Sequence, residues 1–197
     1  MARRGQYAKG AAKRAEILAV ALEVVAEQGT RKASNREIAA RVGLTQPGLM
    51  HYFSTREELF LEVLRARDER DHEQFYSPHQ GFQGFLDVIA HNATVPGLVR
   101  LYVEYSAEAT LEGHLARAFF EERFTWVRGL MVEAVEHEQA AELMGPDVDT
   151  AYVADLVIAA ADGLQVQWLL DPSIDMADRL SRLWQGIRAA SWPVVVA

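Results

Sequence analysis

Five neighbouring residues could form the exposed face of a short helix that enters the major groove of DNA. They are Thr45, Gln46, Gly48, Met50 and His51. Their side chains are small, polar or unbranched, so a helix that presents them can approach the edges of the bases closely. Such a helix must be held by a second one, and the residues around the five are suited to that task.

The apolar residues between 35 and 52 follow the spacing of a helix-turn-helix. In this motif a small residue lies where the helices cross, a glycine takes the positive φ of the turn, and larger apolar residues fill the angle between the helices. The matching residues are Ile38, Ala39, Val42, Gly43, Leu44, Leu49 and Tyr52. The alternative is an ordinary helical hairpin with a solvated basic face.

The charge of the chain is divided unevenly. Residues 1–56 carry ten Lys or Arg and four acidic residues, a net charge of +6, although the whole chain has a net charge of −8. The remaining residues therefore carry −14. Because phosphates attract only the basic part, we expect the first quarter of the chain to meet nucleic acid. The acidic remainder argues against an architectural protein that coats DNA.

The elements that must position these residues are predicted to be helices. Apolar residues recur at helical spacing from 11 to 28, where Gly29 gives a stop signal. Ser34 and Thr45 can each cap a following helix through the side-chain oxygen. A capping box at Thr55 opens a longer helix that connects the two parts of the chain.

The rest of the chain is also predicted to be helical, without strands. Further helices are expected over 82–92, from 96 onward, over 114–141, over 149–170 and along the last apolar run. The predicted fold is therefore all-α with about nine helices. Residues 1–54 form one expected domain and residues 55–197 the other.

Two apolar stripes near the C-terminus exceed what a small helical body needs to bury. One recognition helix reads too few bases for a useful binding site, so we expect two copies of the chain to be joined through these stripes. The expected interface residues are Leu156, Ala160, Gly163, Leu164, Leu180, Leu183, Trp184 and Ile187. The alternative is that both stripes pack wholly inside one monomer.

The stretch from Ser34 to Leu59 resembles the DNA-binding signature of the tetracycline-repressor (TetR) family. The residues that match the family pattern are Ser34, Ile38, Ala39, Gly43, Leu49, Phe53, Glu57 and Leu59, with Leu44, Thr45 and Arg56 as conservative equivalents. The resemblance implies a homodimeric, ligand-responsive transcriptional regulator, usually a repressor, and the absence of cysteine fits a reducing cytoplasm. Its N-terminal domain of three helices would bind a palindromic double-stranded DNA operator, and its C-terminal helical domain would dimerise and bind a small-molecule effector.

The resemblance also implies individual DNA contacts. The residues that it assigns to DNA are Ser34, Arg36, Thr45, Gln46, Gly48, His51 and Arg56. Gln46 is the expected base reader because its amide can form two hydrogen bonds with adenine, and His51 and Arg56 would hold phosphates. At Met50 the family usually has a tyrosine that touches a phosphate, so this contact is lost or moved to His51. Arg3 and Arg4 form either a flexible DNA-binding arm or a solvated tail.

Aromatic residues in the acidic remainder are candidates for the effector pocket. The residues are Phe85, Tyr102, Tyr105, Trp126 and Trp168. Tyr105 and Trp126 are favoured because each combines a polar atom with an apolar ring, although plain core packing explains such residues as well. Residues 161–172 resemble the regulatory domain of the choline-responsive repressors. The sequence does not identify the effector.

Catalysis and membrane insertion find little support in the sequence. The chain has no cysteine, no Gly-x-Ser-x-Gly and no glycine-rich phosphate loop, so no catalytic residue, metal ligand or cofactor is expected. No run of 18 uncharged apolar residues occurs, and a transmembrane helix is therefore not expected. The alternative function is an all-helical small-molecule-binding protein or enzyme with a vestigial helix-turn-helix.

Overall fold

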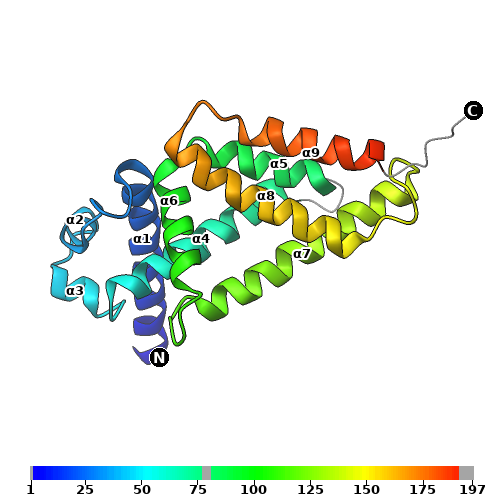
Figure 1. The fold of residues 1–197 in the computed structure, drawn as a ribbon. Helices are drawn as coiled ribbons and strands as arrows, with labels where there is room; N and C mark the ends of the chain where they lie inside the picture. Colours follow the sequence, from blue (N-terminus) through cyan, green and yellow to red (C-terminus); the bar gives the residue numbers. More distant parts are fainter. Residues whose placement is uncertain (1, 77–80, 191–197) are drawn as a thin grey trace, which may run out of the picture. The chain divides into compact units, whose positions relative to one another are not determined.

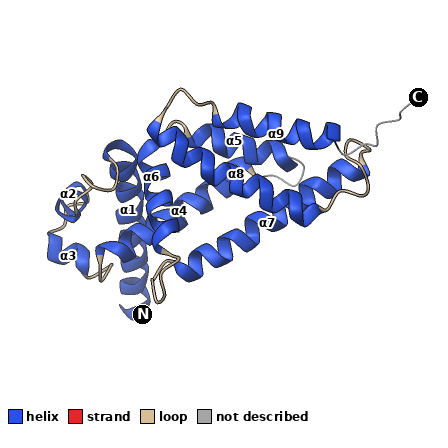
Figure 2. Ribbon diagram, viewed as in Figure 1, coloured by secondary structure: helices blue, strands red, loops and turns tan. Residues whose placement is uncertain are grey.

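The computed structural model describes residues 2–76 and 81–190, and within these ranges every regular element is a helix (Figure 1; Figure 2). The helices are α1 (Ala2–Gln28), α2 (Asn35–Arg41), α3 (Gln46–Met50), α4 (Arg56–Phe75), α5 (Gly81–Asn92), α6 (Pro96–Glu108), α7 (Arg117–Ala140), α8 (Thr150–Leu170) and α9 (Met176–Ala190). The prediction of an all-α fold with about nine helices is confirmed for the described part of the chain.

The first helix is longer than the sequence pattern predicts. α1 begins at Ala2, whereas the apolar spacing indicates a helix only from about residue 11. Most of residues 2–9 are good helix formers, which favours the longer helix. Arg3 and Arg4 therefore lie within a helical stretch of backbone.

The contacts between residues divide the chain into two compact units. The first unit combines the residues up to Asp71 with Val95–Ala116, and the second combines His72–Thr94 with the residues from Arg117 onward. α4 contributes residues to both, and α6 belongs to the first. The functional boundary predicted after residue 54 does not coincide with this division by contacts, and it stays a prediction.

In the first unit, α1 packs against both α2 and α6, and α2 packs against α3. α1 ends at Gly29, whose φ of 74° suits a residue without a Cβ. The start of α6 lies so close to α1 that a Cβ on Gly97 would be 1.9 Å from the carbonyl oxygen of Val25. The contact between α1 and α6 is therefore one between backbones, and it requires glycine at position 97.

In the second unit, four helices form a closed set of contacts. α7 packs against α8, α8 against α9, α9 against α5, and α5 against α7. The rings of Phe82 in α5 and Trp184 in α9 stack with their centroids 4.0 Å apart. Leu180 and Trp184 are only 1% and 3% exposed. These two residues, expected at an interface between chains, thus belong to the core of one chain, because α9 uses them to fill the space beside α5.

α8 is long and apolar enough to cross a membrane by length and composition alone. The sequence criterion of 18 uncharged residues did not detect this property, because Asp155 and Asp162 interrupt the apolar run. A helix in the core of a soluble protein passes the same test. One side of α8 buries Val153, Val157 and Trp168 inside the second unit, and Asp155 forms an ion pair of 2.6 Å with Arg128 of α7.

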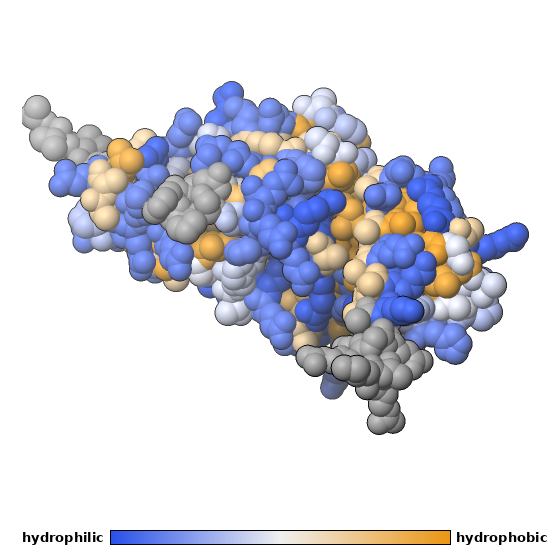
Figure 3. All heavy atoms as spheres, turned by 180° about the vertical axis from the view of Figure 1, so that it is seen from behind, coloured by the Kyte–Doolittle hydropathy of each residue, from blue (hydrophilic) through white to orange (hydrophobic). Residues whose placement is uncertain are grey.

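The other side of α8 is apolar and exposed. Its large exposed side chains are Tyr152, Leu156, Val166 and Leu170. Figure 3 shows the face opposite to the view of Figure 1, on which hydrophilic residues predominate with hydrophobic patches between them. These four residues share one face of α8 in two pairs, each one turn apart, with the small exposed residues Ala159 and Gly163 between the pairs. This face is named the α8 stripe below.

Candidate nucleic-acid interface

The helix pair α2–α3 is held by the residues that the spacing predicts. Ile38, Ala39 and Leu49 are at most 1% exposed and fill the angle between the helices. Gly43 has a φ of 68°, and the amide of Leu44 donates a 2.8 Å hydrogen bond to the carbonyl of Ala39 across the turn. The sequence therefore forms a helix, a tight turn and a second short helix, as a helix-turn-helix requires.

Each helix of the pair begins with the expected cap. The hydroxyl oxygen of Ser34 accepts a 3.1 Å hydrogen bond from the amide of Glu37, and that of Thr45 accepts one of 3.2 Å from Gly48. A Cβ on Gly48 would lie 3.3 Å from the same Thr45 oxygen, so the small residue keeps this cap unstrained. Both hydroxyl groups remain exposed, and each can still donate its own hydrogen to a phosphate.

The outer side of α3 presents the residues expected to meet DNA, with one difference. Thr45, Gln46 and His51 are exposed, and Gly48 is partly exposed. Met50 is instead turned toward α2, where its sulfur accepts a 3.4 Å hydrogen bond from the side-chain amide of Asn35. This contact ties the last residue of α3 to the first residue of α2. It explains why a residue without a donor group occupies a position at which the family usually has a tyrosine.

Arg56 does not project freely, as a phosphate ligand would. Its guanidinium donates a hydrogen bond to the backbone carbonyl of Thr30 and lies 4.7 Å from the centre of the Phe60 ring. The hydroxyl of Thr30 in turn donates a 2.8 Å hydrogen bond to Glu104 of α6. Arg56 and Glu104 thus fix the loop after α1 from two sides. The sequence alone did not indicate this role, because the acceptor is a backbone carbonyl in a distant loop.

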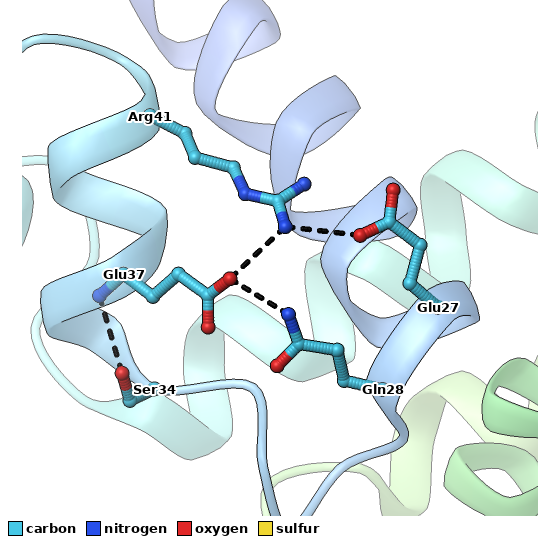
Figure 4. A network of polar contacts seen from close by, with 5 residues as sticks. All are labelled: Glu27, Gln28, Ser34, Glu37 and Arg41. Atoms are coloured by element: carbon cyan, nitrogen blue, oxygen red, sulfur yellow. Dashed lines mark hydrogen bonds and ion pairs between the residues drawn. The ribbon is translucent and has the colours of Figure 1, made fainter.

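Several other basic residues of the first unit are neutralised within the protein. Arg41 forms ion pairs of 2.9 Å with Glu27 and 3.0 Å with Glu37, as Figure 4 shows. The hydrogen bond to Glu27 is the main reason why the pKa of Arg41 lies above its usual value. Lys13 pairs with Glu16 and Arg14 with Glu62. Of these ion pairs, Glu37–Arg41 and Lys13–Glu16 have the sequence spacing of helical pairs between neighbouring turns, whereas the other two join residues far apart in the sequence.

Arg36 differs from these residues. It lies in the first turn of α2 beside the exposed Ser34, and its side chain is exposed. It has no ion-pair partner among the residues that the structure describes. Its charge is therefore available to an external anion, which agrees with its expected place among the DNA contacts.

The expected pocket residues fall into different units. Tyr102 and Tyr105 belong to the first unit, whereas Phe85, Trp126 and Trp168 belong to the second. The structure therefore does not bring the five together within either unit. Among the described residues, no group of three His, Asp or Glu is placed to hold a metal ion.

Tyr105 and Trp126 have distinct surroundings. Tyr105 is 7% exposed, and burial is the main reason why its pKa is raised well above that of a free tyrosine. Its hydroxyl lies 3.4 Å from the carbonyl oxygen of Glu57. Trp126 is half-buried, with the rings of His72 and Tyr76 each 5.4 Å from its own. The role of these two residues in binding an effector stays a prediction.

The remaining interface residues lie on α8 and α9 of the second unit. Leu156 and Gly163 are exposed, and Ala160, Leu164, Leu183 and Ile187 are partly exposed. Unlike Leu180 and Trp184, these six residues are accessible to a second copy of the chain.

Comparison with known proteins agrees with the helix-turn-helix. Residues 17–63 match the sequence model of the bacterial regulatory proteins of the tetR family. The chain is 25% identical over 179 residues to the HTH-type transcriptional regulator PksA of Bacillus subtilis, with 87% of this chain and 85% of the relative covered. It is 24% identical over 189 residues to the regulator UidR of Escherichia coli, with 93% of each protein covered.

Solved structures share the fold. A transcriptional regulator from Rhodococcus sp. Rha1 superposes with a TM-score of 0.67 and 18% identity, covering 90% of this chain and 95% of the other. A gamma-butyrolactone receptor superposes with a TM-score of 0.58 and 18% identity, covering 95% and 92%. These curated relatives are named as transcriptional regulators, which favours that reading over the enzyme considered as an alternative. The chain therefore carries a helix-turn-helix that matches the DNA-binding region of the tetR family, and it is similar over most of its length to transcriptional regulators.

Proposed function

We propose that this regulator binds a palindromic operator as a homodimer, acts as a repressor in the bacterial cytoplasm, and is released from DNA by a small molecule. The observation that carries the DNA-binding part is the exposed outer side of α3, whose inner side packs on α2. Gln46 is the first residue of α3, and its exposed amide is placed where a recognition helix contacts base edges.

The α8 stripe supports the proposed homodimer. A contiguous apolar surface on a helix costs solubility unless a partner covers it, and a second copy of the same surface is the simplest partner. Six of the eight residues expected at the interface remain accessible on α8 and α9, and one of them, Leu156, belongs to the stripe. We propose that α8 and α9 pair with their counterparts in the second copy.

The proposed effector is a small molecule that binds in the part of the chain after residue 54. One structural relative is a gamma-butyrolactone receptor by name, so this fold accommodates such a ligand in at least one protein. We propose that residues 1–54 bind DNA and residues 55–197 bind the effector and dimerise, with Phe85, Tyr102, Tyr105, Trp126 and Trp168 as the candidate contacts. Choline belongs among the probes, because residues 161–172 resemble the choline-responsive branch.

The experiment that tests DNA binding is operator selection from a random duplex library, followed by binding measurements on the selected sequence. The wild-type protein is expected to select an inverted repeat. Gln46→Ala should lose about 1–3 kcal/mol at one base position of each half-site, because the bidentate amide contact is removed. Its affinity for random-sequence DNA should stay the same, since the phosphate contacts are untouched.

Gln83→Ala is the matched control for this experiment. Gln83 is exposed on α5, in the second unit, and its amide bonds to Asp87. This variant should select the same operator as the wild type with the same affinity. Failure of the wild-type protein to enrich any sequence would refute the proposed function, and unchanged selectivity of Gln46→Ala would refute the role of α3.

A further inference from the structure

The loop between α1 and α2, residues 29–34, presents two basic side chains that the helix-turn-helix pattern does not include. Arg31 and Lys32 follow each other in this loop, and both are exposed. They are flanked by Thr30 and Ala33, which are 5% and 0% exposed. The two exposed cations therefore lie between two buried residues that anchor the loop.

The anchors hold the loop in one conformation. The amide of Ala33 donates a 3.1 Å hydrogen bond to the carbonyl of Gly29, which closes the loop on itself. Thr30 is held by two hydrogen bonds. Its carbonyl accepts one from Arg56, and its hydroxyl donates one to Glu104. The backbone on either side of Arg31 and Lys32 is therefore tied to the rest of the unit.

The ion pairs of the first unit decide which cations can meet an external anion. Four of the basic residues between 9 and 56 are engaged within the protein: Lys13, Arg14, Arg41 and Arg56. Lys9, Arg31, Lys32 and Arg36 are exposed and have no ion-pair partner within residues 9–76 and 81–190. The carboxylate nearest to Arg36 in sequence, Glu37, is already occupied by Arg41 and Gln28 (Figure 4).

The contact between Asn35 and Met50 brings the loop with Arg31 and Lys32, and the start of α2 with Arg36, close to α3. Since the first residue of α2 touches the last residue of α3, the loop that leads into α2 lies next to the end of the recognition helix. A helix in the major groove has a phosphate backbone on either side of it. Cations at one end of that helix therefore reach phosphates and not bases.

We infer that Arg31 and Lys32, together with Arg36, form a phosphate clamp on the DNA backbone next to the groove that α3 enters. This inference rests on the proposed function and extends it to residues outside the helix-turn-helix. In this arrangement Arg56 is a positioning residue, which holds the loop through Thr30 instead of binding a phosphate itself. The clamp contributes to binding on every sequence, because phosphates carry no base information.

The test is the salt dependence of binding to a random-sequence DNA duplex, measured between roughly 50 and 200 mM salt. Each phosphate contact adds about 0.9 to the slope of log affinity against log salt concentration. Arg31→Gln and Lys32→Gln should each make the slope less steep by about 0.9 for each DNA-bound copy of the chain, and the double variant by about 1.8. Arg31 and Lys32 are both exposed, so the variants should fold normally. Circular dichroism checks that they do.

Arg41→Gln is the matched control, because it removes one positive charge from the same unit at a residue that is already ion-paired. Its slope should equal that of the wild type. An equal decrease in Arg41→Gln and Arg31→Gln would mean that only the general field of the unit matters, and it would overturn the clamp. Unchanged slopes in the double variant would overturn it as well. If the wild-type protein binds the duplex without any salt dependence, the proposed function fails instead of the clamp.

Discussion

At the scale of single residues, the ion pairs decide which basic side chains can act on DNA. Sequence position alone places Arg56 among the phosphate ligands, but the structure commits its guanidinium to Thr30 and Phe60. Met50 is similarly turned inward to Asn35. Neither contact was predictable from the sequence, because both depend on how a loop or a neighbouring helix is oriented. The exposed Thr45, Gln46 and His51, by contrast, follow directly from the helical spacing.

The buried tyrosine of α6 gives a prediction about pH. Burial raises the pKa of Tyr105 above the value of 10.0 for a free tyrosine, so in alkali the unfolded chain loses this proton before the folded chain does. The stability that Tyr105 provides is therefore complete below pH 10 and is lost as the pH rises above it. The free energy of unfolding should fall by up to about 1.4 kcal/mol per pH unit from this group alone.

The measurement is urea unfolding across the alkaline range for the wild type and for Tyr105→Phe. The variant keeps the ring and lacks the titrating hydroxyl, so its stability should decline less steeply above pH 10. Lysines and the other tyrosines titrate in both proteins, and the difference between the two curves isolates Tyr105. Parallel curves would show that this hydroxyl is not protected by burial.

At the scale of elements, apolar spacing and a few capping residues make the helices predictable. Ser34 and Thr45 each cap a helix at the place that the sequence indicates, and Gly29 and Gly43 have the positive φ expected of stops and turns. The association of α6 with the first unit was not predictable. It depends on a backbone contact between Gly97 and Val25, which lie far apart in the sequence and leave no periodic signal.

That contact makes the stability of the protein sensitive to any side chain at Gly97. In Gly97→Ala the new methyl group would lie 1.9 Å from the backbone oxygen of Val25, and a backbone atom cannot move aside as the end of a side chain can. The helices α1 and α6 must then separate, and the free energy of unfolding should fall by about 3 kcal/mol. Chemical denaturation followed by circular dichroism measures this loss.

Gly129→Ala is the control for the same change in a helix. Gly129 lies in α7, and nothing stands within 4 Å of the position of its added Cβ. Alanine there should leave stability unchanged or raise it by roughly 0.5–1 kcal/mol, since glycine is a poor helix former. If both variants lost the same stability, helix propensity would explain the effect and the close approach at Gly97 would not.

At the scale of the whole molecule, the α8 stripe is the feature that one chain leaves unexplained. The sequence analysis recognises apolar stripes on the last two helices but cannot divide them between the core and an interface. The structure makes that division for α9, where Trp184 stacks on Phe82. On α8 it leaves Tyr152, Leu156, Val166 and Leu170 exposed. An operator made of two half-sites about 34–36 Å apart needs two copies of α3, which the proposed dimer would supply.

Val166→Glu tests the dimer without disturbing the fold of one chain. Val166 is 45% exposed, so a charge there meets water in a monomer but would be buried in a dimer joined through the stripe. We expect sedimentation analysis to show a dimer for the wild type and a monomer for this variant, with the helix content of both proteins unchanged. The variant should also lose its affinity for the inverted repeat, since a single head cannot contact both half-sites.

The control for the charge itself is Leu143→Glu. Leu143 has a similar exposure of 49% but lies between α7 and α8, outside the stripe, and its substitution should leave the dimer intact. A wild-type protein that sediments as a monomer and still binds the inverted repeat tightly would contradict the proposal. Dissociation of both variants would show that added negative charge alone, on an already acidic body, separates the two copies. If Val166→Glu is a monomer and Leu143→Glu stays a dimer, the interface is assigned to α8. This result would also explain why α8 is apolar on two sides.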